Sequence, residues 1–137
     1  MSVLRSCSII LAMSLTTTLA FAEDFDGSQP LECTAKSGRD CLPTKSSCGP
    51  LNPESNRAPI YGIDVANKQV HSPYRTALMP ILYTNTNQDS LVLQGADLGF
   101  AWSAIVNRKT GAMTISVADK QGAYVVFGEC KIAPKKD

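Results

Sequence analysis

The chain has 137 residues, and its 13 Lys and Arg nearly balance its 12 Asp and Glu. A chain this close to neutral is not expected to take nucleic acid or an anionic membrane surface as its main partner. The length suits a single domain that buries roughly two-thirds of its unfolded surface.

The N-terminus has the three regions of a secretory signal peptide. A head with one positive charge, Met1 to Arg5, precedes a run of apolar and small residues, Ser8 to Leu19, and Ala20-Phe21-Ala22 is an A-x-A cleavage site. A membrane anchor fits poorly, because the run is shorter than the ~20 residues of a spanning helix and no second run follows. We therefore predict cleavage after Ala22, which leaves a periplasmic chain of 115 of the 137 residues with no membrane span.

Four of the five cysteines remain in that mature chain. An even number in an exported protein predicts disulfides, here two. A zinc site is the competing interpretation, but spacings of eight and seven residues are not the close pairs of metal sites, and His71 is the only histidine. No metal or other cofactor is expected. The four cysteines are Cys33, Cys41, Cys48 and Cys130.

Residues 23–58 are rich in Ser, Gly, Pro, Asn and Lys and show little periodicity. We expect this segment to be mostly irregular and to be tied down by its cysteines. Within it, Pro30 to Ala35 is the one stretch that predicts a strand, with Leu31 and Cys33 on one face.

Residues 59–130 predict a β-meander. Ile60 to Val65 and Lys68 to His71 read as a hairpin, and Thr76 to Thr84 is a mostly apolar third segment. Pro80 removes a donor from the sheet ladder, so we expect it at an edge, a bulge or a bend. A short helix is the alternative for this segment.

Residues 90–130 hold four short runs rich in Val, Ile, Leu and aromatic residues, separated by turn-forming residues. The clearest half-buried strand lies around residue 115, where apolar and small or polar residues alternate. Residues 131–137 are expected to be a tail. The inward set is Met113, Ile115 and Val117, and the outward set is Thr114 and Ser116.

About eight strands with short links and no amphipathic helix follow from these segments. Short hairpins make neighbouring strands antiparallel, and a sheet of this many twisted strands tends to close on itself. We predict an all-β fold, an up-and-down meander that closes into a small barrel or a curled sheet. Two packed sheets are the alternative.

Closing the meander predicts the disulfide pairing. The strand at 30–35 would then lie beside the last strand, 123–130, so that Cys33 and Cys130 meet across the seam. Cys41 and Cys48 remain, joined by a short link that suits a local bridge. The seam bridge closes a loop of about 97 residues and should stabilise the fold by about 4 to 5 kcal/mol in the chain-entropy model.

The sequence carries no catalytic or cofactor motif, and we do not expect an enzyme. His71 beside Ser72 is the simplest base and hydroxyl pair, but neighbours in a strand point to opposite faces. Trp102, on an apolar strand face, is expected in the core. Arg108 and Lys109, at the tip of an exposed hairpin, are the candidate partner-binding residues, and a solvated turn is the simpler interpretation.

Three stretches, FDGSQPLEC, LVLQGADLGFAWSAIVNRKTGAMT and VVFGEC, resemble a group of small, uncharacterised, exported β-rich proteins of proteobacteria. The resemblance implies export and a β-fold but no activity. In outline the chain also resembles the periplasmic inhibitors of C-type lysozyme. Residues 110–113, TGAM, lack the serine and tyrosine of the Ser-Gly-x-x-Tyr loop that those inhibitors use.

Two functional hypotheses follow. The first is a non-catalytic exported β-domain that binds a protein or an envelope component. The second is an inhibitor of an exported hydrolase such as lysozyme, with Arg108 and Lys109 as a probe that enters an acidic cleft.

Overall fold

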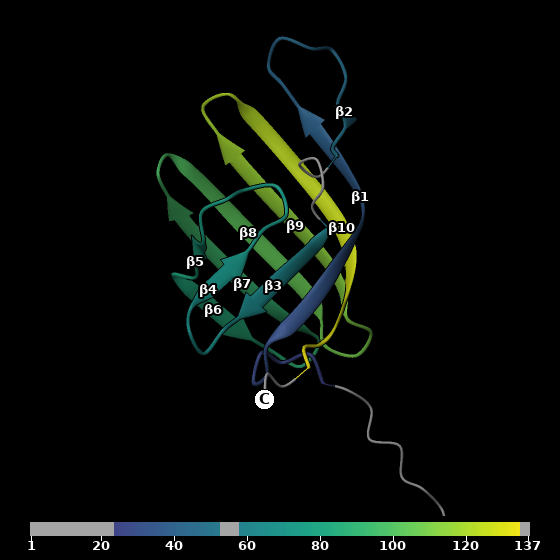
Figure 1. The fold of residues 1–137 in the computed structure, drawn as a ribbon, viewed down its shortest axis with the longest axis vertical. Helices are drawn as coiled ribbons and strands as arrows, with labels where there is room; N and C mark the ends of the chain where they lie inside the picture. Colours follow the sequence, from purple (N-terminus) through teal and green to yellow (C-terminus); the bar gives the residue numbers. More distant parts are fainter. Residues whose placement is uncertain (1–23, 53–57, 135–137) are drawn as a thin grey trace, which may run out of the picture.

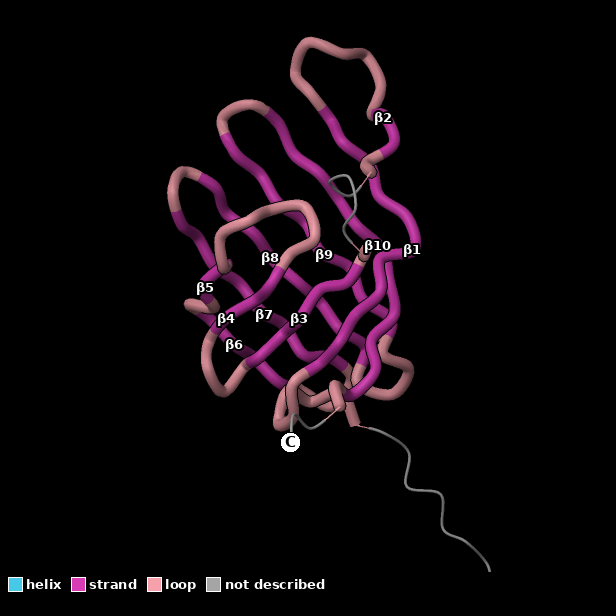
Figure 2. The backbone as a smooth tube through the Cα atoms, in the orientation of Figure 1, coloured by secondary structure: helices cyan, strands magenta, loops and turns pink. Residues whose placement is uncertain are grey.

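The structure is a computed structural model that describes residues 24–52 and 58–134. The predicted signal peptide, its cleavage site after Ala22 and the end of the predicted tail lie outside these ranges. The described ranges hold ten strands and contain no helix that could cross a membrane (Figure 2). The strands are β1 (Leu31–Cys41), β2 (Gly49–Pro50), β3 (Ile60–Asp64), β4 (Gln69–His71), β5 (Met79–Pro80), β6 (Tyr83–Thr86), β7 (Ser90–Asp97), β8 (Phe100–Asn107), β9 (Ala112–Asp119) and β10 (Gly122–Ile132).

All ten strands belong to one antiparallel sheet, which confirms the predicted fold class. The strand order in the sheet is β5-β4-β3-β1-β10-β9-β8-β7-β6. The short strand β2 lies off this path and pairs with the second half of β1. From β6 to β10 the strands follow one another as an up-and-down meander (Figure 1). β1 lies between β10 and β3, as closure of the meander predicted, and so joins the last strand to an early one.

One chain segment joins the two ends of this sheet. β5 pairs with β4 at one end and β6 pairs with β7 at the other, and only Ile81 and Leu82 separate β5 from β6. The Ile81 amide donates to the carbonyl of Lys68 at 2.9 Å, and the Leu82 amide donates to the carbonyl of Gln94 at 2.9 Å. Pro80 lies at the end of β5, directly before this crossing, as expected of a proline in a sheet. The sheet is therefore curled into a barrel-like wall.

The interior of the curl is filled with the protein's own side chains. Along β9, alternate residues are buried and outward, so Met113, Ile115 and Val117 face inward as predicted. Alternation of period two continues through β7 and β8, because each strand has one face on the core. Trp102 is 4% exposed, which confirms its expected place in the core.

β1 is longer than the strand predicted at 30–35, so less of residues 23–58 is irregular than expected. Its second half, KSGRDC, shows no alternation of apolar and polar residues. The backbone pairing with β10 holds this half in the sheet instead. The register shifts between Ala35 and Ser37, as at a β-bulge, and then continues to Cys41. β10 likewise continues two residues beyond Cys130, to Ile132.

Both predicted disulfides are present. Cys33 bonds Cys130 across the β1–β10 ladder, with Cα atoms 3.9 Å apart. Cys41 bonds Cys48 and closes the short loop between β1 and β2. The first bridge joins strands from opposite ends of the described chain, and the second orders a polar segment that has few apolar residues of its own.

Candidate functional site

Arg108, one of the two predicted partner-binding residues, is held by contacts within the protein. Its guanidinium donates to both carboxylate oxygens of Asp24, at 2.9 Å through Nε, and to the carbonyl of Asn87 at 2.6 Å through Nη1. The bonds to Asp24 raise the pKa of Arg108 further. The amide of Phe25 also donates to the Arg108 carbonyl at 3.1 Å. Arg108 therefore fastens the start of the described chain to the β8–β9 turn.

Lys109 remains presented to solvent at the same hairpin tip. Its side chain is 71% exposed, and its Nζ lies 3.3 Å from Asp89 Oδ1. The side-chain oxygen of Asn107 accepts from the amides of Lys109 and Thr110 and so shapes the turn. The role of this turn in partner binding stays a prediction. That prediction now depends on Lys109, because Arg108 is engaged by Asp24 and Asn87.

His71 and Ser72, the simplest base and hydroxyl pair in the sequence, point to different sides of the sheet. His71 is exposed on the outside of β4, and Ser72 is buried at 3% exposure. The Ser72 hydroxyl accepts from the amide of Tyr74 at 3.1 Å, which serves the local turn. In the part of the chain that the structure describes, no three His, Cys, Asp or Glu side chains gather as metal ligands.

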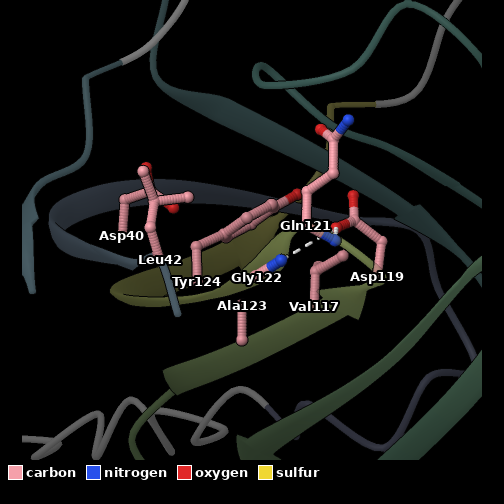
Figure 3. Close-up of a pocket in the computed structure, with 8 residues that line it drawn as sticks. All are labelled: Asp40, Leu42, Val117, Asp119, Gln121, Gly122, Ala123 and Tyr124. Carbon is pink, nitrogen blue, oxygen red and sulfur yellow. Dashed lines mark hydrogen bonds between the residues drawn. The ribbon is translucent and has the colours of Figure 1, made fainter. Parts of the chain in front are cut away.

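A small pocket of about 190 Å³ lies where β9 turns into β10 (Figure 3). Tyr124 forms one wall, and Asp119 lies beside Gln121 and Gly122. One Asp119 oxygen accepts from the amides of Gln121 at 2.7 Å and Gly122 at 3.1 Å, so this carboxylate closes the turn. The pocket is therefore mainly a product of turn geometry.

Three tyrosines pack in a row, and the middle one, Tyr74, comes from the loop that follows β4. The ring centres of Tyr61 and Tyr74 are 5.9 Å apart, as are those of Tyr74 and Tyr124. Burial raises the pKa of Tyr61 and of Tyr124, and the charge of Arg75 opposes the shift at Tyr124. Among the described residues, neither of these two phenol oxygens nor the Trp102 indole nitrogen has a hydrogen-bond partner. Tyr61 belongs to the buried core, and the partly buried Tyr74 and Tyr124 pack against that core.

A larger hollow, a groove of about 650 Å³, lies on the outside of β1, β3 and β4. Gly62 lies at its floor, paired in register with Glu32 on one side and His71 on the other. A Cβ atom built on Gly62 would meet only the Cβ of His71, at an ordinary 3.5 Å. Packing therefore does not require glycine here, although glycine weakens a strand interior and often marks a place where a ligand approaches closely.

The groove combines apolar walls with an acidic rim. Ile60, 37% exposed, and Pro30 contribute apolar surface, and Asp64 stands at one end. Asn67 donates to the Asp64 carboxylate through its amide nitrogens, at 3.0 Å from the backbone and 2.7 Å from the side chain. These bonds lower the pKa of Asp64, so it stays anionic down to acidic pH.

No family model, curated protein or solved structure matches this chain.

The predicted site and the observed groove lie in different places, and sequence reasoning missed the groove. Its residues come from β1, β3, β4 and the segment after β10, which only the sheet order brings together. The one signal in the sequence was Gly62, a glycine within a predicted strand.

Proposed function

We propose that this protein is an exported, non-catalytic binding domain whose partner is a protein or an envelope component. The observation that carries the proposal is the groove over Gly62, which lies on the outer wall of a sheet whose interior is already filled. A small curled sheet of this kind has little room inside for a ligand. Binding on the outside is what the geometry supports.

Export is supported by the signal-peptide pattern that ends at Ala22 and by the two disulfides. Disulfides form and persist in oxidising compartments such as the bacterial periplasm. The resemblance to exported proteobacterial proteins agrees with this compartment. We therefore propose a periplasmic location for the mature chain.

The chemistry of the groove favours a partner segment with an apolar side chain next to a basic one. Apolar surface from Pro30 and Ile60 would receive the first, and the Asp64 carboxylate would receive the second. Glu32 adds a second carboxylate at the rim, although its Oε1 is already 2.9 Å from Lys131 Nζ. Asp64 is bonded by the neutral Asn67, so its charge is available to a cation.

The experiment is capture from periplasmic extract with the mature protein and two glycine variants as bait. Gly62→Val fills the groove floor, and Gly49→Val is the matched control because a Cβ there meets nothing within 4 Å. We expect the parent and Gly49→Val to retain the same partner and Gly62→Val to lose it. A partner that Gly62→Val retains, or no specific partner for the parent, would contradict the proposal.

Inhibition of an exported hydrolase such as lysozyme is the narrower alternative. The observation in its favour is the exposed ammonium group of Lys109 on a turn that Arg108 and Asn107 hold in shape. This alternative uses the protruding β8–β9 turn, whereas the first proposal uses the groove over Gly62. Mutations at Lys109 and at Gly62 therefore test the two functions separately.

A further inference from the structure

The outer face of β8, β9 and β10 carries no charged side chain over three successive rows of the sheet. The first row consists of Ile105, Thr114 and Phe127, which are directly paired across the three strands. Ile105 is 49% exposed and Phe127 is 48% exposed, so this row has two large apolar side chains in solvent. The other two rows are Ser103, Ser116 and Val125, and then Ala101, Ala118 and Ala123.

We call these nine outward positions the neutral wall. The outward positions of β7 that continue these rows, Val92, Gln94 and Ala96, are uncharged as well. By contrast, the outward positions of β1 and β3 include Glu32, Lys36 and Asp64. Charge therefore begins at the border of the neutral wall, where Arg39 of β1 is paired with Val125 and Glu129 follows Phe127 along β10. An exposed face that lacks charge and carries large apolar side chains is typical of an interaction surface.

The neutral wall has a hollow beside its apolar row. A shallow depression of about 290 Å³ lies over the serine and alanine rows, because their side chains are small. The two serine hydroxyls, of Ser103 and Ser116, are hydrogen-bonded to each other at 2.9 Å. One hydroxyl donates to the other, so each oxygen has a partner and only the hydrogen of the accepting hydroxyl is left without an acceptor. Covering the floor of the hollow with an apolar group therefore costs less than burying two unpaired hydroxyls.

We propose that the neutral wall is the contact through which two copies of this chain associate. In a two-fold symmetric contact the same patch meets itself, so it must supply both a protruding and a receiving part. Phe127 and Ile105 protrude, and the hollow two residues along the strands receives them from the other copy. The symmetry axis then passes through the middle row, at Ser116 on the central strand.

The charge pattern favours a second copy over a charged partner. A face without charge brings no like charges together when it meets itself, whereas a charged partner would lose its solvation without gaining an ion pair. Two sheets that pack face to face lie ≈ 10 Å apart, a distance that Phe and Ile side chains opposite Ala and Ser can fill. β3 and β4 lie across the curl from β7 and β8 (Figure 1). The groove over Gly62 is on the outside of β1, β3 and β4, so this dimer would leave it open.

The first test is sedimentation equilibrium of the mature protein over a wide range of concentration. We expect a reversible monomer–dimer equilibrium, and Phe127→Lys should weaken it at least tenfold because a buried ammonium group has no partner on the wall. Ile60→Lys is the matched control, since Ile60 is a half-exposed apolar side chain on the charged side of the sheet. It should leave the dimer unchanged. A parent that stays monomeric up to about 1 mM, the weak end of specific association, would overturn the proposal.

The second test places the contact independently of any loss of folding. Ser116→Cys should form a disulfide with itself in the other copy under mild oxidation and give a covalent dimer. Gln69→Cys, on the outside of β4, is the control and should give no covalent dimer. A parent dimer that Phe127→Lys leaves intact and Ser116→Cys does not cross-link would place the contact elsewhere and overturn the assignment of this wall.

Discussion

Cys33 and Cys130 are directly opposite each other in the β1–β10 ladder, although 97 positions separate them in the chain. The bridge between them therefore closes nearly the whole folded domain, whereas the bridge between Cys41 and Cys48 closes seven positions. Both bonds are intrachain, so their contributions to stability differ mainly through the length of the loop that each closes.

Removing the seam bridge should destabilise the protein more than removing the local one. In the chain-entropy model the loss is about 4 to 5 kcal/mol for Cys33→Ala with Cys130→Ala and about 2 to 3 kcal/mol for Cys41→Ala with Cys48→Ala. Denaturant titration of the two double variants measures both. Equal losses, or the reverse order, would show that loop length does not decide the effect.

The buried strand face on β9 should be much more sensitive than its outward face. Ile115 is fully buried, so Ile115→Ala should lower the free energy of unfolding by roughly 2 to 4 kcal/mol through lost burial and a residual cavity. Thr114→Ala, one residue away and exposed, should lower it by less than about 1 kcal/mol. Similar values for both variants in urea titrations would be inconsistent with the observed faces.

Two glycines in strands should respond oppositely to alanine. A Cβ at Gly95 would collide with the Pro80 carbonyl oxygen and the Trp102 indole, so Gly95→Ala should cost at least about 1 to 3 kcal/mol. Gly62→Ala meets no such obstacle and should be neutral or stabilising by up to about 1 kcal/mol. Thermal melts of the two variants test this, and a Gly95→Ala protein as stable as the parent would contradict the close approach of β5 to β7.

The buried phenol of Tyr61 should make the fold sensitive to alkali. Burial raises its pKa above the ordinary 10.0, so the unfolded chain loses the proton first and stability falls as the pH rises above 10. Tyr61→Phe should remove part of this fall. At pH 7 it should be no less stable than the parent, because the oxygen has no partner among the described residues, and it should gain up to about 1 to 2 kcal/mol.

The control for this variant is Tyr83→Phe, which changes a phenol that is 50% exposed. Its unfolding curves at pH 7 and pH 11 should follow those of the parent. A clear loss of stability in Tyr61→Phe at pH 7 would mean that the Tyr61 hydroxyl forms a bond that stabilises the fold.

Replacing Arg108 should affect the folded structure, whereas replacing Lys109 should affect only partner binding. Arg108→Ala removes the contacts to Asp24 and Asn87, so the segment around Phe25 should become more susceptible to proteolysis. Lys109→Ala should leave proteolysis and stability unchanged, since exposed ion pairs contribute little. If the parent inhibits lysozyme, Lys109→Ala should weaken the inhibition. A parent without inhibition removes the hydrolase-inhibitor hypothesis.

Much of the fold could be predicted because its strands bury one face. Alternation around Ile115 predicted the faces of β9, and closure of the meander predicted the bridge from Cys33 to Cys130. The second half of β1 was missed, because a polar strand held by backbone pairing has no hydrophobic period to detect. The crossing at Ile81 was also missed, since Pro80 indicated a bend but not its direction.

The sites were harder to predict than the fold, because they depend on residues that only the sheet brings together. Arg108 looked like a free charge at a loop tip, and its partner Asp24 lies 84 positions away in the chain. The absence of charge on the neutral wall becomes visible only when Ile105 and Phe127 are known to share a row across β9.

The place of β1 in the sheet has a consequence for how an exported chain would acquire its bonds. β1 emerges before β10 during synthesis and translocation, yet β10 is the neighbour that holds Cys130. Until then the thiol of Cys33 has Cys41 and Cys48 as its nearest reactive neighbours in the chain. A bond from Cys33 to Cys41 formed at this stage would have to be exchanged before the native pattern is reached, whereas early formation of Cys41–Cys48 leaves Cys33 free for Cys130. The order in which the N-terminal cysteines oxidise should therefore decide whether maturation waits for disulfide isomerisation.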